Sequence, residues 1–224
     1  MSVTDTESTL NSRARLIEAA IFCFSEKGYD ATGIREIALK AKANSALVQY
    51  HFGGKEGLFR EAMKIIFSQH PPVVTAMPAS PDQPGARAMA IQAFRTCIGS
   101  LVYELMACSA GSALDRAALL LITRELQAPH PEVIPLVMEH VRPYLTQMEA
   151  CLAILRPDLT GPPVMDMTMS IYGQIFHLHN NLHLIRLLRA DPEFPRDLEQ
   201  LVDHFTAFNL RGIAIPEAFP PAGA

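Results

Sequence analysis

The sequence predicts an all-α protein with an N-terminal three-helix helix-turn-helix domain, followed by a larger helical ligand-binding and dimerisation domain. Three observations support this prediction. Apolar residues recur every three to four positions, and the alternation typical of β-strands is almost absent. The segment HPPVVTAMPASPDQPG, residues 70–85, carries five prolines and divides the chain. Hydrophobic residues make up 49% of the chain and charged residues 19%, which is enough apolar side chain to bury a core.

The first domain is predicted over residues 12–68. Residues 1–11 are expected to form a flexible arm, and Ser12 is expected to cap the first helix. Gly28 stops that helix, as a left-handed residue at a helix end does. Thr32 is the expected cap of the second helix, and Gly53 ends the third. The predicted helices of this domain cover residues 12–27, 32–41, 45–52 and 55–68.

The second domain is predicted over residues 86–214. Its apolar stretches are longer than those of the first domain and have the period of a helix. Short segments rich in glycine or proline separate them. The predicted helices cover residues 86–107, 114–127, 132–155, 164–189 and 195–210.

Charge is distributed unevenly along the chain. The net charge is −4, yet residues 31–64 contain six Lys or Arg and only three Asp or Glu. A small basic patch on an acidic body suits a protein that touches a polyanion with one face.

Cysteine usage and hydropathy indicate a cytoplasmic protein. The four cysteines, Cys23, Cys97, Cys108 and Cys151, form no CxxC pair and lie within apolar helical patterns, so we expect reduced and mostly buried thiols. The N-terminus lacks the basic and apolar regions of a signal peptide, and no apolar run is long enough to span a bilayer, so no membrane partner is expected.

The informative stretch is ATGIREIALKAKANSALVQYHFGGKEGLF, residues 31–59. It contains two short helices joined by a turn of about three residues, which are the dimensions of a helix-turn-helix. In the later of these two helices, residues 45–52, Val48 and Phe52 are four positions apart and can anchor one face to the core. Gln49 and Tyr50 then project elsewhere and can hydrogen-bond to a base or a phosphate. A helix that enters the major groove of double-stranded DNA needs this arrangement.

Residues 12–59 resemble the N-terminal DNA-binding domain of the TetR/AcrR family of bacterial regulators. The resemblance rests on RLIEAAIFCFSEKGYDAT in the first helix, IREIA in the second and VQYHFGGKEGLF at the end of the third, and it covers about a fifth of the chain without a gap. By position, it implies base contacts for Arg35, Ser45, Ala46 and Gln49, and phosphate contacts for Thr32, Tyr50, His51 and Lys55.

Several of these residues also have plainer interpretations. Tyr50 and His51 can pack against the first helix instead of contacting DNA. Arg35 can form a surface ion pair with Glu36 or Glu61, which contributes little to stability.

Two positions depart from the family pattern. Lys42 stands where the family usually has glycine, so the turn is strained if it requires a positive φ, or else Lys42 adds a phosphate contact. Gln49 stands where the family usually has tyrosine, so the base preference of other members does not carry over. For Lys55, which does not depart from the family pattern, the plainer interpretation is an exposed lysine at the start of a helix.

The second domain resembles the C-terminal domain of a TetR subgroup in LLLITRELQAPHP, residues 119–131, in Pro143 and in the apolar stretch from Met169. The resemblance implies that Arg124 and Glu125 form a structural ion pair, although a plain surface pair fits equally well. It also implies a homodimer through the last two long helices, whose apolar residues are Met165, Met169, Tyr172, Phe176, Leu182, Leu201, Phe205 and Phe208.

A pocket for a small-molecule effector is expected among the middle helices, where methionines suit an adaptable apolar site. Ordinary core packing is the alternative for each of its residues. The candidate residues are Phe94, Ile98, Leu101, Met106, Leu120, Thr123, Val137, Met138, Val141, Met148 and Phe176.

The predicted function is a transcriptional repressor that a ligand releases from a palindromic operator. The alternatives are a helical metal-binding protein or enzyme centred on His177, His179 and His183, and a helical interaction protein. His179 and His183 are four positions apart, as two metal ligands on one helix face are, but no glutamate or cysteine motif accompanies them. The chain shows no nucleophile with a base, no glycine-rich phosphate loop and no paired carboxylates, so we expect neither catalysis nor a cofactor.

Overall fold

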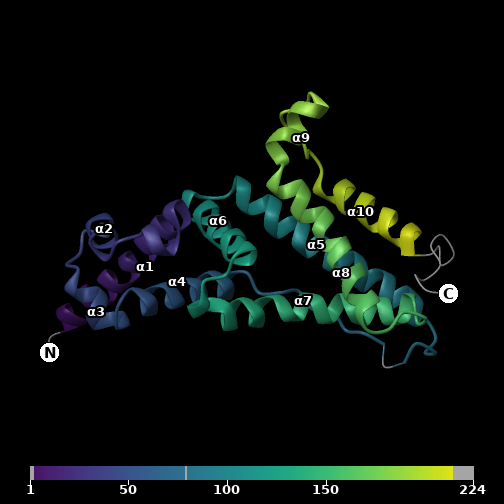
Figure 1. The fold of residues 1–224 in the computed structure, drawn as a ribbon, viewed down its shortest axis with the longest axis horizontal. Coiled ribbons are helices and arrows are strands. Elements are labelled where there is room, and N and C mark those ends of the chain that lie inside the picture. The colour runs from purple at the N-terminus through teal and green to yellow at the C-terminus, as the bar shows by residue number, and fades with distance from the viewer. Residues whose placement is uncertain (1–2, 79, 214–224) are drawn as a thin grey trace. The chain divides into compact units, whose positions relative to one another are not determined.

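A computed structural model describes residues 3–78 and 80–213, apart from the side chains of residues 3–10 and 107–110. The described residues form ten α-helices and one 3-10 helix and no strand, so the predicted all-α fold is confirmed (Figure 1). The helices are α1 (Val3–Ala31), α2 (Ile34–Lys40), α3 (Ala46–Phe52), α4 (Lys55–Gln69), α5 (Ala86–Ala110), α6 (Ala113–Gln127), η1 (Pro131–Val133), α7 (Ile134–Leu155), α8 (Pro162–Asn180), α9 (Leu182–Arg189) and α10 (Leu198–Ile213).

These helices group into two compact units. The first contains the described residues up to 71 together with 107–140, and the second contains 72–106 together with the described residues from 141. Helix α6 therefore belongs to the same unit as the helix-turn-helix. The predicted linker is free of helix over 70–78 and 80–85.

The core of the first unit lies between α1, α4 and α6. Phe24 of α1 and Phe59 of α4 are fully buried and meet edge to face, with ring centroids 4.8 Å apart. Each ring removes enough apolar surface from water to stabilise the fold by about 2–3 kcal/mol. Further buried side chains close this core around α2 and α3, namely Leu16, Ile37, Val48, Leu58, Met63 and Ile66.

The first helix is longer than predicted. It begins at Val3, so the arm predicted over residues 1–11 is wrong from residue 3 onward. Ser12 is buried inside this helix and is not its cap. Gly28 has φ 79° and ψ 173°, a non-helical conformation that breaks α1 at the predicted residue. The ψ value is not that of the predicted left-handed cap, and α1 continues beyond the kink to Ala31.

Thr32 does not cap α2, because the residue at that position is Gly33. The Thr32 hydroxyl instead donates hydrogen bonds to the carbonyls of Cys23 (3.1 Å) and Gly28 (2.7 Å) at the end of α1. This side chain therefore faces the preceding helix.

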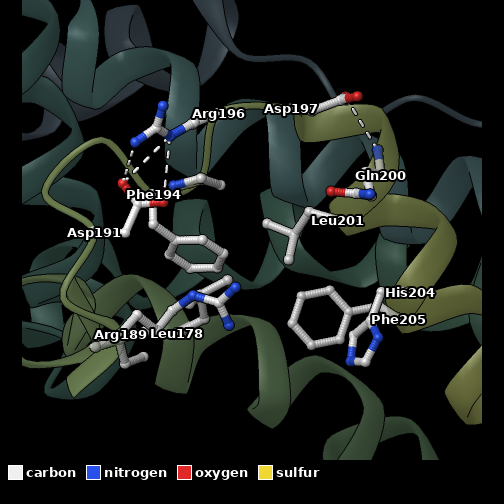
Figure 2. A pocket seen from close by; sticks show the side chains of 12 residues that line it. Leu178, Arg189, Asp191, Phe194, Arg196, Asp197, Gln200, Leu201, His204 and Phe205 are labelled. Carbon is white, nitrogen blue, oxygen red and sulfur yellow. Dashed lines mark hydrogen bonds and ion pairs between the residues drawn. The ribbon is translucent and has the colours of Figure 1, made fainter.

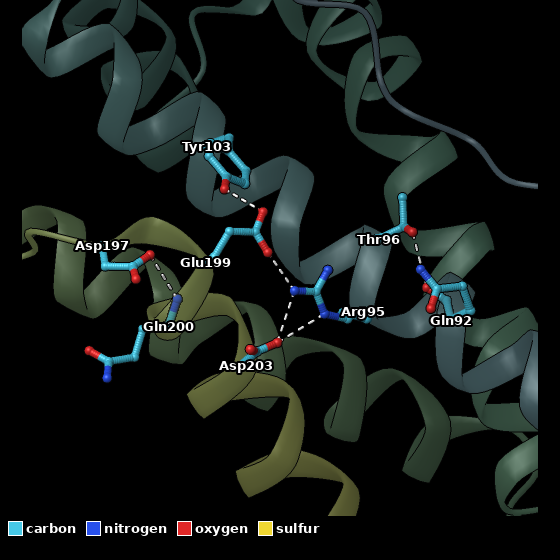
Figure 3. A network of polar contacts seen from close by, with 8 residues as sticks. All are labelled: Gln92, Arg95, Thr96, Tyr103, Asp197, Glu199, Gln200 and Asp203. Atoms are coloured by element: carbon cyan, nitrogen blue, oxygen red, sulfur yellow. Dashed lines mark hydrogen bonds and ion pairs between the residues drawn. The ribbon is translucent and has the colours of Figure 1, made fainter.

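The second unit is built around α5, α7, α8 and α10, with Phe94, Ile98, Met148, Leu152 and Ile175 fully buried. A polar network joins α5 to α10 on its surface (Figure 3). Arg95 donates to Asp203 at 2.9 and 3.0 Å and to Glu199 at 2.5 Å, and the Tyr103 hydroxyl donates to Glu199.

The helix predicted over 164–189 is interrupted. Helix α8 ends at Asn180 and α9 begins at Leu182, because Asn181 adopts φ −112° and ψ 17°. The Asn181 side chain donates to the carbonyl of His177 at 2.9 Å. Such a bond between a side chain and the backbone competes with continued helix.

Two further helix starts differ from the prediction. Helix α6 begins one residue early, because Ser112 and Asp115 form a reciprocal capping box. Helix α10 begins at Leu198, three residues after the predicted start, where the Asp197 carboxylate accepts the N–H of Gln200 at 3.1 Å.

Cys23, Cys97 and Cys151 are free and buried, as predicted, whereas the side chain of Cys108 lies outside the described part. Among the described residues, no helix is long and apolar enough to cross a bilayer.

Candidate nucleic-acid interface

Helix α3 has an apolar back and a polar front. Val48 is fully buried and Leu47 is half-buried, so this side attaches the helix to the first unit. Ser45, Ala46, Gln49 and Tyr50 are exposed, and Tyr50 is 74% exposed despite its large ring. A tyrosine packed against α1, the plainer interpretation, would be covered. The predicted amphipathic arrangement of this helix is present.

Arg35 is available on α2. The acidic residues that could neutralise it are engaged elsewhere, since Glu36 pairs with Lys27 and Glu61 pairs with Arg13, each at 2.6 Å. The bond from Lys27 also lowers the pKa of Glu36 below its usual value. Within the described part of the chain Arg35 is exposed and has no ion-pair partner, so its guanidinium is free to donate to a ligand.

The turn between α2 and α3 places Lys42 in the left-handed region, with φ 50°. Its N–H donates to the carbonyl of Leu39 (3.1 Å), and the N–H of Ala43 donates to that of Ala38 (2.9 Å). These two bonds form a Schellman motif, which usually has glycine where Lys42 stands. The positive φ gives the suggested strain a structural basis. The side chain is exposed, which leaves its charge available for the suggested phosphate contact.

Three glycines shape the connection from α3 to α4. Gly53 and Gly54 have φ values of 71° and 125°, which let the chain reverse direction. Gly57 permits close contact, because a Cβ there would lie 1.8 Å from the carbonyl oxygen of Phe52, the last residue of α3. The role of Gly57 was not predicted, although the spacing of glycines in GGKEG is the sequence signal for it.

Lys55 is half-buried at the start of α4. Its ammonium lies 4.3 Å from the centre of the Tyr29 ring and donates to the carbonyl of Asp30 at 3.4 Å. Lys55 is therefore held by the end of α1 and is more than an exposed helix start. Its remaining donors and the positive end of α4 keep this point favourable for an anion.

His51 and Phe52 attach the end of α3 to α1. The Nε2 atom of His51 lies 3.4 Å from the Ser12 hydroxyl, so the plainer interpretation, packing against the first helix, holds in part. The guanidinium of Arg13 lies 5.4 Å from the centre of the Phe52 ring while it pairs with Glu61. Arg13 therefore contacts both the end of α3 and a side chain of α4, and no pattern in the sequence marks this position.

The candidate effector residues fall in two places. Leu120 and Met138 are 52% and 45% exposed on the first unit, so they do not line an interior pocket. Thr123 and Val137 are buried in the same unit. The others are buried or half-buried in the second unit, namely Phe94, Ile98, Leu101, Met106, Val141, Met148 and Phe176.

The predicted ion pair between Arg124 and Glu125 does not form among the described residues. Adjacent residues on a helix point in different directions, which separates their charges. Glu125 is buried and accepts the N–H of His130 at 2.8 Å, and burial raises the pKa of its carboxyl group. Arg124 lies against Gly28 of α1.

A cavity of about 530 Å³ opens between α8, α9 and α10 in the second unit (Figure 2). Phe194, Leu201 and Phe205 face it, and the Arg189 guanidinium lies 4.2 Å from the centre of the Phe194 ring. None of the candidate effector residues lines this cavity.

The histidine cluster is divided by the interruption at Asn181. His179 lies in α8 and His183 in α9. The two residues therefore do not share one continuous helix face, which was the argument for both of them binding a metal ion. His177 and His183 are exposed, whereas burial lowers the pKa of His179. Among the residues described, no group of three or more His, Cys, Asp or Glu side chains is arranged to hold a metal ion.

Comparison with known proteins identifies both parts of the chain. Residues 16–62 match the bacterial regulatory proteins of the tetR family. Residues 92–213, more than half of the chain, match the C-terminal domain of the HTH-type transcriptional dual regulator CecR.

Curated relatives match in the N-terminal segment. It is 41% identical over 49 residues to the "Probable HTH-type transcriptional regulator YttP" of Bacillus subtilis, covering 22% of this chain and 24% of that protein. It is 38% identical over 53 residues to the biofilm operon icaADBC HTH-type negative transcriptional regulator IcaR of Staphylococcus aureus, covering 24% and 28%. The chain thus matches only about a quarter of the length of these relatives.

Solved structures match over nearly the whole length. The fatty acid degradation regulator FadR from Bacillus halodurans aligns with a TM-score of 0.55 at 16% identity, covering 91% of this chain and 96% of that one. This likeness shows the fold alone. The two matched domains confirm the predicted family, whose members are regulators and not enzymes. The chain belongs to the TetR family of DNA-binding transcriptional regulators, with a C-terminal domain of the CecR type.

Proposed function

We propose that the protein is a cytoplasmic repressor that binds a palindromic operator as a homodimer and leaves it when a small molecule binds. The observation that carries the proposal is the amphipathic α3, where buried Val48 anchors a helix that exposes Gln49 and Tyr50. IcaR, to which the N-terminal segment is similar, is a negative transcriptional regulator, and this similarity supports repression. In this proposal residues 12–68 bind DNA, and residues 86–214 bind the effector and the second subunit.

The proposed contacts with DNA follow from exposure. Arg35 and Gln49 read base edges, helped by Ser45 and Ala46. Tyr50, His51 and Lys55 contact phosphates and set the position of α3. We leave Thr32 out of this set, because its hydroxyl is buried and donates to two carbonyls.

Dimerisation through α8 and α10 is supported by their uncovered apolar side chains. Met165, Met169 and Phe208 are 40%, 44% and 59% exposed, although contact of these apolar side chains with water is unfavourable. Tyr172 and Leu201 are already buried within the subunit, so they do not serve the interface. A two-fold axis would present two α3 helices to half-sites about 34–36 Å apart or at a multiple of that distance.

Selection of bound fragments from random or genomic DNA, followed by affinity measurements at several salt concentrations, tests the proposal. We expect Arg35→Ala and Gln49→Ala each to cost about 1–3 kcal/mol on the selected site and to relax its base preference. Lys55→Ala should weaken all sequences alike and reduce the salt slope by about one. Arg87→Ala removes an exposed arginine from α5, outside the proposed dimer interface, and is the matched control.

The proposal fails if no fragment is enriched, or if Arg35→Ala and Arg87→Ala have the same effect on base preference. A chain that selects DNA and stays monomeric when bound would refute the homodimer alone. Enrichment that no candidate effector changes would leave the DNA assignment standing and remove support for ligand release.

A further inference from the structure

The cavity between α8, α9 and α10 has walls that are mainly apolar. Its volume of about 530 Å³ falls within the range of about 300–1,000 Å³ in which proteins hold small organic molecules. The three helices and the segment that joins α9 to α10 all contribute apolar residues to it, namely Leu178, Ile185, Phe194, Pro195, Leu201 and Phe205. Two of these six residues carry aromatic rings, which favour contact with another ring.

One guanidinium points into the same space. Arg189 is the last residue of α9, and its guanidinium lies 4.2 Å from the centre of the Phe194 ring (Figure 2). Arg189 is exposed, but this contact holds its charged end beside the ring. Among the described residues Arg189 forms no ion pair and no hydrogen bond, so its planar set of donors is available to a ligand.

The two acidic residues of the cavity are engaged elsewhere. Asp191 pairs with Arg196, with 2.8 Å between Oδ1 and Nη2, and the bond from Arg196 is the main reason that the pKa of Asp191 lies below its usual value. Asp197 accepts the backbone N–H of Gln200 at 3.1 Å, at the start of α10. Arg189 is therefore the cation of this cavity that no carboxylate of the described residues contacts directly.

Two further polar side chains line the cavity from α10. Gln200 and His204 are four positions apart, so they share one side of the helix, and both are exposed. Neither side chain has a hydrogen-bond partner among the described residues. The site thus offers apolar walls, one cation without an ion-pair partner and polar groups at one side, which suits a molecule with an apolar body and a single negative charge.

We propose that this cavity binds a small aromatic monocarboxylate. Its ring lies among Phe194, Leu201 and Phe205, and its carboxylate accepts hydrogen bonds from Arg189. A carboxylate matches the planar guanidinium with two parallel hydrogen bonds, which a neutral aromatic compound cannot accept in the same way.

This site is separate from the effector pocket expected among the middle helices, because none of those candidate residues lines the cavity. Binding is non-covalent and is built within one subunit. Its test uses no DNA, so its failure would leave the proposed regulatory function standing.

The probe is 2-naphthoate, and 2-naphthamide is its uncharged analogue of nearly the same shape. The chain contains no tryptophan, so the fluorescence anisotropy of the naphthalene ring is read without tryptophan emission. Calorimetry of the full chain gives the stoichiometry. We expect one naphthoate per chain, bound on the order of tenfold more tightly than the amide.

Arg189→Ala should weaken naphthoate binding on the order of 10–100-fold, because a hydrogen-bonded charge is lost, and should change naphthamide binding little. Arg189→Lys keeps the charge without the planar fork, so its affinity for naphthoate should lie between those of the two other forms. Arg87→Ala removes an exposed arginine of α5 in the same unit and is the matched control. Phe205→Leu removes part of the wall, so it should weaken naphthoate and naphthamide by the same factor.

Four results would overturn the proposal. Equal affinity of the unmodified chain for naphthoate and naphthamide would exclude the charge contact, as would equal effects of Arg189→Ala and Arg87→Ala. Half a naphthoate per chain would show a site shared between two subunits. Unchanged binding in Phe205→Leu would place the ligand outside this cavity, and no binding at about 1 mM naphthoate would exclude the ligand class.

Discussion

Replacing Gly57 with alanine should disturb the recognition helix through a single methyl group. The added Cβ would lie 1.8 Å from the Phe52 carbonyl oxygen and 2.9 Å from its carbon, although real Cβ contacts are almost never under 3.0 Å. Both obstructing atoms belong to the backbone, so no side-chain rotation relieves the clash and the end of α3 must move by roughly 1 Å. Overpacking of this kind costs about 1–3 kcal/mol.

The effect should appear in both stability and DNA binding. Thermal unfolding should shift down by about 2–4 °C per kcal/mol for a chain of this size. Affinity for the selected operator should fall by the equivalent of at least one base contact, about 1–3 kcal/mol, because α3 carries Gln49.

Gly173→Ala is the matched control for this substitution. Gly173 lies exposed within α8, and a Cβ there meets nothing within 4 Å. Alanine should stabilise that helix by about 1 kcal/mol through its higher helix propensity. The reasoning is refuted if Gly57→Ala leaves both the unfolding temperature and operator affinity unchanged, or if the two variants shift stability in the same direction.

Three further changes test the first unit. Lys42→Gly should unfold at a higher temperature than Lys42→Ala by about 1 kcal/mol, because both remove the charge and only glycine relieves φ 50°; equal stability would contradict the strain. Glu125→Gln should raise the free energy of unfolding by about 1 kcal/mol at pH 8 and leave it unchanged at pH 4. Burial raises the pKa of this carboxyl group, so the stability that the protonated acid contributes is lost as pH rises. Denaturant unfolding at both pH values measures the difference. Burial lowers the pKa of His140 to about 4. The neutral imidazole therefore contributes fully to the free energy of unfolding above pH 6.5, and up to about 3 kcal/mol of this stability is lost as pH falls toward 4. His140→Phe, which keeps a ring stacked on Phe67, should flatten that decline, and an unchanged pH profile would exclude His140 as its source.

The parts of the fold that sequence predicted well depend on local periodicity. Val48 is four positions from Phe52, which is enough to assign the buried side of α3, and Gly28 and Gly53 mark their helix ends by conformational preference. The exposed positions of Gln49 and Tyr50 follow from the same geometry.

The errors arose where distant partners or side-chain hydrogen bonds decide the structure. Thr32 has the preference of a helix cap, yet carbonyls at the end of the previous helix receive its hydroxyl. Asn181 lies within an apolar helical pattern and interrupts it by bonding to His177.

The helix-turn-helix and the contacts around Tyr29 show the same distinction at the level of sites. A helix-turn-helix is contiguous, so its residues are found from a single segment. Tyr29, Lys55 and His130 are far apart in sequence, and only the fold reveals that they meet.

The position of α6 in the first unit constrains how an effector could act on α3. Arg124 of α6 lies so close to Gly28 that a Cβ there would meet its Nη1 atom at 2.3 Å. His130, which follows α6, packs on Tyr29 with ring centroids 4.0 Å apart, and Tyr29 in turn holds Lys55 at the first residue of α4. A displacement of α6 therefore meets a continuous path of touching side chains to the connection between α3 and α4. Any coupling carried along that path is reciprocal. If the effector lowers the affinity of the protein for its operator, the operator should lower the affinity for the effector by the same factor.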